Sequence, residues 1–362
     1  MKISILLPDL RGGGAERLHL VLAREFVSRG HQVDFALMRN TGELLDEVLP
    51  ETRIHDLKAP CFRNLLFPLM RFLKNERPDA LLAAMWPLTS FAIWAVKLSG
   101  VPTRVVVSDH SILSLSPSAK GRLGTFPMQL TMRSSYRWAD EIVGVSKGVA
   151  QDIARLARLD AEEINIIYNP AARGELTSEP TTDSGVSNWL NATQRLITVG
   201  KLKAVKDHVT LLNAFARIVV ENDQASLLIL GDGAMRSVLE QQVGELALVD
   251  RVSMPGYVQD PYPYYLAADL FVLTSEYEGF GNVIVEAMEC GLPVIATDCP
   301  SGPREILDDG EYGKLVPVGD VNALAAAMLA SLEDEPNPQR QKDRAADFSI
   351  EKAAVRYLQL LA

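Results

Sequence analysis

Residues 269–297 read DLFVLTSEYEGFGNVIVEAMECGLPVIAT, and this stretch decides the fold. Two short apolar runs, 269–275 and 293–297, have the length and composition of buried strands. Between them a glycine-rich turn leads to Asn282, a good helix N-cap, and then to an apolar run that predicts a buried helix. A strand, a helix and a second strand in this order form the unit from which parallel sheets are built.

Two carboxylates bracket the turn, because Glu278 and Glu286 are separated by seven residues. Glu286 lies one turn inside the predicted helix, where an unpaired charge is costly, so it needs hydrogen-bond donors. Glu278 precedes the helix, in a loop that Gly279 and Gly281 make flexible. We interpret the pair as two acceptors for a ligand rich in hydroxyl groups, with the free N–H groups of a helix N-terminus between them.

The same alternation of apolar strands and helices runs along the chain and predicts parallel sheets covered on both faces. The other expected strands are 3–8, 31–38, 53–57, 79–85, 103–109, 140–146, 163–169, 195–200, 226–231 and 251–256. Residues 171–194 are rich in Thr, Ser, Gly, Asn and Pro and predict a linker. The fold class is therefore α/β, with two facing doubly wound domains, 1–170 and 195–347, and a cleft between them. The tail 348–362 is apolar at helical spacing and needs a surface to cover.

Composition limits the function classes. The 362 residues suffice for two domains, and 48% hydrophobic with 23% charged residues is typical of a soluble globular protein. A net charge of −10 argues against nucleic acid as a partner. The charge is uneven, since residues 1–170 carry +3 and the remainder −13, which leaves an anionic surface open as a partner of the first half. Three cysteines without metal-ligand spacing, and an N-terminus without a cleavage site, favour a cytoplasmic protein.

A run of 17 residues without a charge lies between Asp79 and Lys97. A membrane span needs ~20 mostly apolar residues, and Pro87, Thr89 and Ser90 interrupt this run. A strand followed by a helix that opens at Pro87 is the better interpretation.

The glycine-rich turn at Gly12-Gly13-Gly14 follows the first strand and opens a helix. Its spacing does not match the dinucleotide fingerprint, because Arg17 occupies the third glycine position. No Gly-Lys-Ser or Gly-Lys-Thr occurs, so the phosphate loop of ATP-binding proteins is absent too. What remains is a turn with free N–H groups that suits a phosphate or a hydroxyl group, or a glycine turn of purely structural use.

A lysine cluster follows the first strand of the second half. Gly200 is followed by Lys201, Lys203 and Lys206 in a domain of strongly negative net charge. The cluster is either a solvated surface or a pair of ammonium groups directed at an anion.

At this point the chain resembles the retaining glycosyltransferases of family 4. The resemblance rests on four blocks in order: Gly-Gly-Ala-Glu at 13–16, Val199-Gly-Lys-Leu-x₃-Lys206, Leu230-Gly-Asp-Gly233, and Glu278-x₇-Glu286 with Gly-Phe-Gly inside. It spans essentially the whole chain. It implies the GT-B fold, in which two Rossmann-like domains face one another, a C-terminal helix crosses back, and the second domain binds most of the donor nucleotide sugar.

The resemblance also implies roles for individual residues. Glu286 is similar to the family's ribose-binding glutamate, and Glu278 to the glutamate that holds hydroxyls of the transferred sugar. Lys201 and Lys206 match the basic pair on the diphosphate, although the family most often has Arg at the first position. His110 resembles the histidine near the reacting sugar. The remaining expected donor contacts are Gly13, Gly14, Gly200, Phe280, Gly281, Asn282 and Val283.

The expected activity is transfer of a hexose or N-acetylhexosamine, with retention, from a UDP-sugar to a glycan or a polyprenyl-diphosphate-linked acceptor. No two aspartates are two positions apart, so the Asp-x-Asp device for a metal is absent, and no metal or other cofactor is expected. Residues 298–306 are similar to a subgroup that builds lipid-linked glycans, lipopolysaccharide or exopolysaccharide. Two alternatives stay open: an epimerase or phosphorylase of the same fold, and a UDP- or sugar-binding protein without catalysis.

Two basic segments of the first half raise the question of a membrane. Residues 62–77 place an apolar stripe beside Arg63, Arg71, Lys74 and Arg77, and residues 120–138 form a second basic, partly apolar run. Either both are ordinary amphipathic helices with their apolar faces on the core, or the first domain rests on the inner face of the cytoplasmic membrane.

Overall fold

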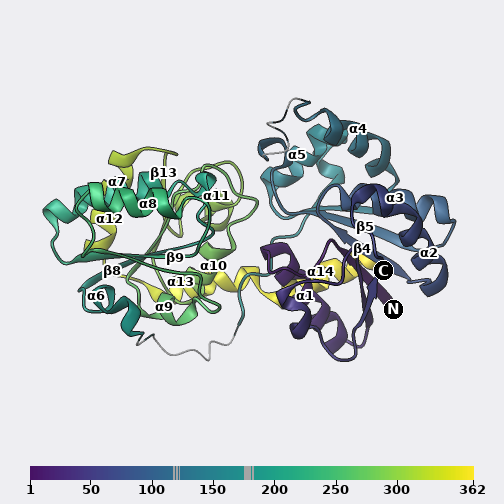
Figure 1. Ribbon diagram of the computed structural model, residues 1–362, viewed down its shortest axis with the longest axis horizontal. Helices are drawn as coiled ribbons and strands as arrows, with labels where there is room; N and C mark the ends of the chain where they lie inside the picture. The colour runs from purple at the N-terminus through teal and green to yellow at the C-terminus, as the bar shows by residue number, and fades with distance from the viewer. Residues whose placement is uncertain (117–118, 120, 122, 175–180, 182) are drawn as a thin grey trace. The chain divides into compact units, whose positions relative to one another are not determined.

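A computed structural model describes residues 1–116, 119, 121, 123–174, 181 and 183–362. The chain divides into two compact units, Met1–Pro170 with Ile350–Ala362, and Ala171–Ser349. Both contain a parallel sheet with helices on its two faces, so the predicted α/β class is confirmed (Figure 1).

The first unit holds a seven-stranded parallel sheet in the order β3-β2-β1-β4-β5-β6-β7. Its strands are β1 (Lys2–Leu7), β2 (Gln32–Leu37), β3 (Arg53–Asp56), β4 (Ala80–Ala84), β5 (Arg104–Asp109), β6 (Glu141–Gly144) and β7 (Asn165–Ile166). Its helices are α1 (Gly14–Ser28), α2 (Leu66–Glu76), α3 (Leu88–Ser99), α4 (Phe126–Ser135), α5 (Lys147–Ala157) and α14 (Ile350–Leu361). The uncharged run thus forms β4 and α3, as expected.

The second unit holds a six-stranded parallel sheet in the order β10-β9-β8-β11-β12-β13. Its strands are β8 (Gln194–Val199), β9 (Ala225–Leu230), β10 (Val252–Gly256), β11 (Leu270–Leu273), β12 (Val294–Thr297) and β13 (Lys314–Val316). Its helices are α6 (Ser187–Leu190), α7 (His208–Glu221), α8 (Arg236–Glu245), α9 (Tyr262–Ala267), α10 (Asn282–Glu289), α11 (Pro303–Ile306), α12 (Val321–Glu333) and α13 (Pro338–Ala345). Pro255 is tolerated in β10 because that strand lies at the edge of the sheet.

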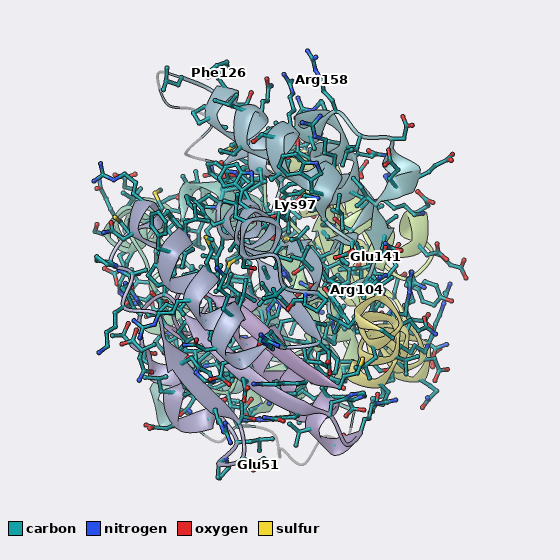
Figure 2. The ribbon with its side chains drawn as sticks, turned by 90° about the vertical axis from the view of Figure 1, so that its right-hand side faces the viewer. Glu51, Lys97, Arg104, Phe126, Glu141 and Arg158 are labelled. Carbon is teal, nitrogen blue, oxygen red and sulfur yellow. The ribbon has the colours of Figure 1, made fainter. Side chains whose placement is uncertain are left out.

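The C-terminal helix α14 packs in the first unit, although the residues just before it belong to the second. Tyr357 and Leu361 lie in the same core cluster as strands β1 and β4. The guanidinium of Arg104 donates to the carbonyl of Leu360 at 2.6 Å and to Glu141 at 2.9 Å (Figure 2). The apolar face of α14 is buried against the first unit, so the tail 348–362 covers a surface, as its helical spacing of apolar residues predicts.

Two details differ from the sequence prediction. The N-cap of α10 is Gly281, and Asn282 is the first helical residue. Gly281 has φ 106°, a left-handed conformation that glycine adopts without steric cost. The turn into the helix is therefore made by the glycine and not by the asparagine that follows it. The short strand β13 was not predicted, because its three residues are too few to form a period.

Candidate active site

The candidate donor site lies where the order of the second sheet reverses. Strands β8 and β11 are neighbours, whereas β8 leads on to β9 and β11 leads on to β12 on opposite sides. In open parallel sheets, ligands bind outside the carboxyl ends of the strands at such a switch point. The loops that leave these two ends are 200–207 and 274–281, and they contain the predicted lysines and Glu278.

An ion pair joins the two loops. Lys206 Nζ donates to Glu278 Oε1 at 2.5 Å, and Ser275 Oγ donates to the same oxygen at 2.6 Å. The hydroxyl of Thr274 also bonds the carbonyl of Lys206, at 2.8 Å. Only 21% of the Lys206 side chain and 12% of the Glu278 side chain are exposed, so water screens this pair less than a surface pair. The ammonium group is therefore fixed at the end of β8.

The other residues of the loop after β8 differ in how close they lie to this ammonium group. Gly200 lies next to the lysine stem, since a Cβ placed on it would be in ordinary van der Waals contact with Cε of Lys206, at 3.7 Å. Lys201 is exposed, and the neighbouring Leu202 is buried and anchors the loop. The structure thus brings Lys206 to Glu278 and places Gly200 beside Lys206, whereas Lys201 extends toward solvent.

Helix α10 carries the second carboxylate. The hydroxyl of Tyr265 donates to Glu286 Oε2 at 3.2 Å. Burial, reinforced by the negative charge of Glu286, raises the pKa of Tyr265 well above its usual value. The tyrosine therefore remains a hydrogen-bond donor. Tyr265 thus supplies the hydrogen-bond donor that Glu286 was expected to need. Because Tyr265 lies on α9, 21 residues before Glu286, no local sequence motif predicted this contact.

A tight loop contact shapes the start of α10. Phe280 is buried, and a Cβ on Gly302 would lie 1.8 Å from its carbonyl oxygen. Ser301 Oγ donates to the carbonyl of Gly279 at 3.0 Å. Asn282 and Val283, the first two helical residues, are partly exposed. The loop after β12 therefore holds the glycine turn in place and leaves the helix N-terminus accessible.

The first unit contributes a glycine turn of its own. Gly12 has φ 85°, Gly13 is the N-cap of α1, and Gly14 is the first helical residue. This arrangement presents backbone N–H groups after the carboxyl end of β1, beside the switch point between β1 and β4.

His110 directly follows β5 and contacts α1. Its Nε2 lies 3.1 Å from Ser108 Oγ, and its ring meets the ring of His19 edge to face, with centroids 5.2 Å apart. Burial and the proximity of His19 lower the pKa of His110 to about 3. The imidazole is therefore neutral at pH 7, and His19 links it to the helix that Gly14 opens.

A hollow of about 530 Å³ lies against His110. Its walls include Phe62, Met85, Trp86, Pro87, Leu113 and Met128. A concave surface of mainly apolar and aromatic side chains with few polar groups is typical of a small-molecule site.

Asp109, which sequence reasoning missed, also lines this hollow. It accepts hydrogen bonds from Trp86 N at 2.8 Å and from the Tyr136 hydroxyl at 2.5 Å. Burial raises its pKa to about 6. Its position beside His110 was the only signal in the sequence, because Trp86 and Tyr136 are 23 and 27 residues away.

Two family models match the chain in succession. "Glycosyltransferase Family 4" matches residues 12–172, and "Glycosyl transferases group 1" matches residues 182–348. The fold is that of a two-domain α/β protein with a parallel sheet in each domain. The chain belongs to the group 1 and family 4 glycosyltransferases, so the predicted family is confirmed.

Relatives with described functions match along almost the whole chain. One is the N-acetylgalactosamine-N,N'-diacetylbacillosaminyl-diphospho-undecaprenol 4-alpha-N-acetylgalactosaminyltransferase of Campylobacter jejuni, 27% identical, over 95% of this chain and 93% of the relative. Another is the lipopolysaccharide core biosynthesis glycosyltransferase LpsE of Rhizobium meliloti, 28% identical, over 97% and 96%.

Solved structures share the fold. HepE of Anabaena, crystallised with UDP, superposes with a TM-score of 0.79 at 22% identity and covers 99% of both chains. The sucrose-phosphate synthase of Thermosynechococcus elongatus gives the same TM-score at 23% identity, over 99% of this chain and 98% of that one. The GT-B fold expected from the sequence is thereby confirmed.

Proposed function

We propose that this glycosyltransferase moves a hexose or N-acetylhexosamine from a UDP-sugar to a glycan or a polyprenyl-diphosphate-linked acceptor, with retention and without a metal in the transfer step. The ion pair of Lys206 and Glu278 carries the proposal. It holds a cation and a hydroxyl acceptor side by side at the switch point of the donor domain, next to the accessible N-terminus of α10.

In this proposal the positive groups stabilise the leaving diphosphate. The Lys206 ammonium and the N–H groups at the start of α10 face the charge that develops as the bond between sugar C1 and phosphate oxygen breaks, and the exposed Lys201 adds a second positive charge from the same loop. The acceptor oxygen forms its bond to C1 on the same face, and its proton passes to the leaving phosphate oxygen. Glu278 orients sugar hydroxyls and forms no bond to the sugar.

The remaining residues bind and position. Glu286, held by Tyr265, accepts from the ribose hydroxyls, and the backbone of Gly200, Phe280, Gly281, Asn282 and Val283 contacts sugar and diphosphate. In the first unit, the N–H groups of Gly13 and Gly14 approach the phosphates, and the neutral His110 faces the sugar without adding charge. The choice of UDP as the nucleotide is supported by the similarity to HepE, which was crystallised with UDP and with UDP-glucose.

The acceptor class is supported by the relatives. The Campylobacter enzymes act, by name, on undecaprenol-diphosphate-linked glycans, and LpsE acts in lipopolysaccharide core assembly. The hollow beside His110 suits the apolar face of an acceptor sugar, since aromatic side chains line it.

Within the described residues, none of the helices has the length and apolar character that crossing a bilayer demands. We propose peripheral attachment of the first unit to the inner face of the cytoplasmic membrane. The apolar stripe of residues 62–77 does not serve this purpose, because Leu65, Leu69 and Leu73 are buried in the core. The contact is made by other exposed apolar side chains, Phe67, Leu123, Phe126 and Leu130, with Arg63, Arg71 and Lys74 exposed on the same unit. Phe126 is labelled in Figure 2. Lys120 and Arg122 of the second basic run lie outside the described residues.

A panel of UDP-sugars tests the function. UDP release is measured with and without a short polyprenyl-diphosphate glycan, and the anomeric configuration of the product is read by NMR. We expect release that depends on the acceptor and a product with the anomeric configuration of the donor. Tight UDP binding without turnover across all donors and acceptors would favour a binding protein, and conversion of the donor without acceptor would favour an epimerase.

Chelation tests the metal-free step separately. We expect turnover to persist after brief treatment with EDTA, because fixed positive groups do the work of a metal. Complete loss of turnover that added Mg²⁺ or Mn²⁺ restores would contradict this mechanism.

A further inference from the structure

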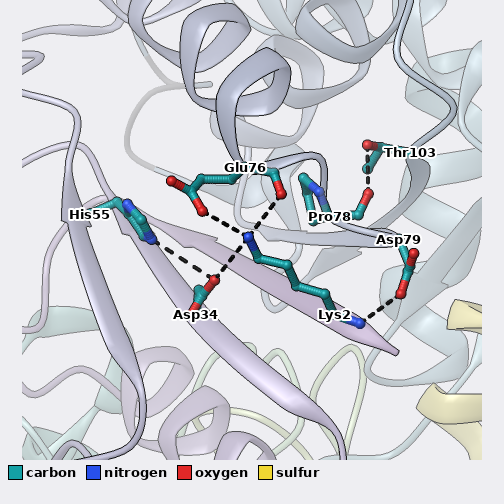
Figure 3. A network of polar contacts seen from close by, with 7 residues as sticks. All are labelled: Lys2, Asp34, His55, Glu76, Pro78, Asp79 and Thr103. Carbon is teal, nitrogen blue, oxygen red and sulfur yellow. Dashed lines mark hydrogen bonds and ion pairs between the residues drawn. The ribbon is translucent and has the colours of Figure 1, made fainter.

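A polar cluster lies under helix α2, at the face of the first unit shown in Figure 3. Asp34 comes from β2, His55 from β3 and Glu76 from the last turn of α2. One ligand atom of each, two carboxylate oxygens and an imidazole nitrogen, lie within 4.8 Å of one another. Lys2, at the start of β1, reaches into the same space. Lys2 lies at the amino end of β1, whereas His110 follows the carboxyl end of β5, at the opposite edge of the parallel sheet. The cluster is therefore separate from the candidate active site.

Several buried atoms of the cluster lack hydrogen bonds among the described residues. Asp34 is completely buried, yet neither of its oxygens accepts a hydrogen bond. Its Oδ2 lies 3.6 Å from Lys2 Nζ, with which it forms an ion pair, and 3.9 Å from His55 Nε2. His55 Nε2 and the hydroxyl of Ser4, which pairs with Asp34 in register, lack hydrogen bonds as well. A buried carboxylate without hydrogen-bond donors is costly, so Asp34 is suited to bind a cation more closely than it binds the Lys2 ammonium.

Charge counting leads to the same conclusion. Lys2 Nζ donates to Glu76 Oε2 at 2.7 Å and to the backbone carbonyl of Glu76 at 2.8 Å. Within the cluster itself, one ammonium stands against two carboxylates, a net charge of −1, and Arg53 is a further positive neighbour of Glu76. A divalent cation in place of the ammonium would bring that charge to zero.

The cluster is also accessible. His55 and Glu76 line a hollow of about 730 Å³ whose other walls include Phe67, Arg71 and Asn75. An ion can enter from this hollow, and water can complete its coordination there, as an entry path and open positions require.

We propose that Asp34, His55 Nε2 and Glu76 form a binding site for a divalent transition-metal ion of the zinc class. Imidazole favours such ions over Mg²⁺ and Ca²⁺, and carboxylates complete a common three-ligand set. The ligand atoms must approach one another by about 1 Å to reach bond lengths of about 2.0–2.2 Å, while the Lys2 ammonium withdraws to solvent. The ion cross-links β2, β3 and α2, so its role is to stabilise the first unit.

Titration with Zn²⁺ and Co²⁺ tests the site on the full chain without an affinity tag. We expect one ion per chain, a rise in the melting temperature of the first unit, and visible Co²⁺ absorption without a sulfur-to-metal band. Lys2→Met removes the competing ammonium and should tighten binding at least tenfold. Asp34→Asn and His55→Gln should each weaken it at least tenfold, and circular dichroism confirms that they fold.

His31→Gln is the matched control, because His31 Nδ1 lies 3.4 Å from the terminal amino group and offers a second pair of nitrogen ligands. We expect this variant to bind as the wild type does. The proposal is overturned if Lys2→Met binds no ion, if binding disappears with His31, or if the Co²⁺ spectrum shows cysteine ligation.

Discussion

Lys206 and Glu278 are 72 residues apart in the chain, and Nζ of the lysine donates to Oε1 of the glutamate at 2.5 Å. The contact exists because β8 and β11 pair in parallel, with Leu196 opposite Leu270, so the loops that follow them leave the same edge of the sheet. The pair is a preorganised unit: the carboxylate fixes the ammonium, and the ammonium compensates the carboxylate. A diphosphate that approaches Lys206 therefore meets a cation that is already in place.

The two glutamates should differ in what their removal costs. Glu286→Ala removes the proposed ribose acceptor, and we expect UDP affinity to fall by about 10- to 100-fold, as loss of a charged hydrogen bond does. Glu278→Ala should leave UDP affinity equal or higher, because Lys206 becomes free for the diphosphate, and should depress turnover. Calorimetry with UDP alone measures both affinities, and Glu245→Ala, an exposed glutamate on α8, is the control. Equal losses of affinity in the two variants would contradict this division.

Lys206→Ala should reduce turnover by about 100-fold or more, as removal of a group that stabilises developing charge typically does. Lys203, three residues earlier and exposed, is the matched control, and Lys203→Ala should retain nearly full turnover. Initial rates of UDP release at saturating donor make the comparison. Similar rates for Lys206→Ala and the wild type would remove the proposed role.

Acidification should destabilise the second unit through His208. Burial, with the charge of Lys206 as the second cause, lowers the pKa of His208 to about 4. Below pH 6.5 the unfolded chain binds a proton that the folded chain does not, so the free energy of unfolding falls as the pH drops from about 6.5 to 4. At pH 5 the loss is about 2 kcal/mol.

Urea unfolding of the wild type and His208→Gln at pH 7 and pH 5 measures this effect. The difference between the two proteins cancels the contributions of His19 and His110, whose pKa values are also lowered. We expect the variant to lose less stability on acidification. The same loss in both proteins would show that His208 is not the responsible group.

The sequence was sufficient to predict the alternation of strands and helices, because apolar runs of strand length have a clear pattern. It also singled out Lys206, Glu278 and Glu286 as candidate site residues, since these residues belong to compact blocks that resemble those of the glycosyltransferase family. It did not reveal that Lys206 and Glu278 bond one another, because that contact depends on which strands are neighbours in the sheet.

Contacts assembled from distant elements were also missed. Asp109 meets Tyr136, and Asp34 approaches His55 and Glu76, at separations that follow no period. The N-cap of α10 was assigned to Asn282 on side-chain preference alone, whereas the backbone angle of 106° requires the glycine before it. At this position the backbone conformation of the turn decides the N-cap, and the side-chain preference of asparagine does not.

The glycine at position 302 should be required for stability of the donor site. Its φ of 85° is unfavourable for any other residue, and a Cβ would approach the Phe280 carbonyl to 1.8 Å. We expect Gly302→Ala to lower the free energy of unfolding by about 2 kcal/mol or more, and to reduce UDP binding because the loop before α10 shifts. Gly244→Ala in α8, where a Cβ meets nothing within 4 Å, is the control and should stabilise by up to about 1 kcal/mol. Wild-type stability in Gly302→Ala would contradict the contact.

The last prediction concerns the proposed membrane contact of the first unit, at helix α4. Phe126 and Leu130 are 60% and 59% exposed, and they lie four residues apart on α4, so they share one face of that helix. Lys97 and Arg137 flank Trp138, which is itself 44% exposed. Apolar side chains beside basic ones suit an anionic leaflet, where each Lys or Arg contributes about 1 kcal/mol.

We expect the wild type to sediment with anionic vesicles and much less with neutral ones. The double variant Phe126→Ser with Leu130→Ser should lose most of this binding and keep its UDP affinity, because it leaves the donor domain unchanged. Val220→Ser is the matched control, since Val220 is 86% exposed on the second unit and its replacement should leave vesicle binding unchanged. If the double variant still sediments as the wild type does, or if the wild type binds neither kind of vesicle, the first unit does not attach to the membrane through this surface.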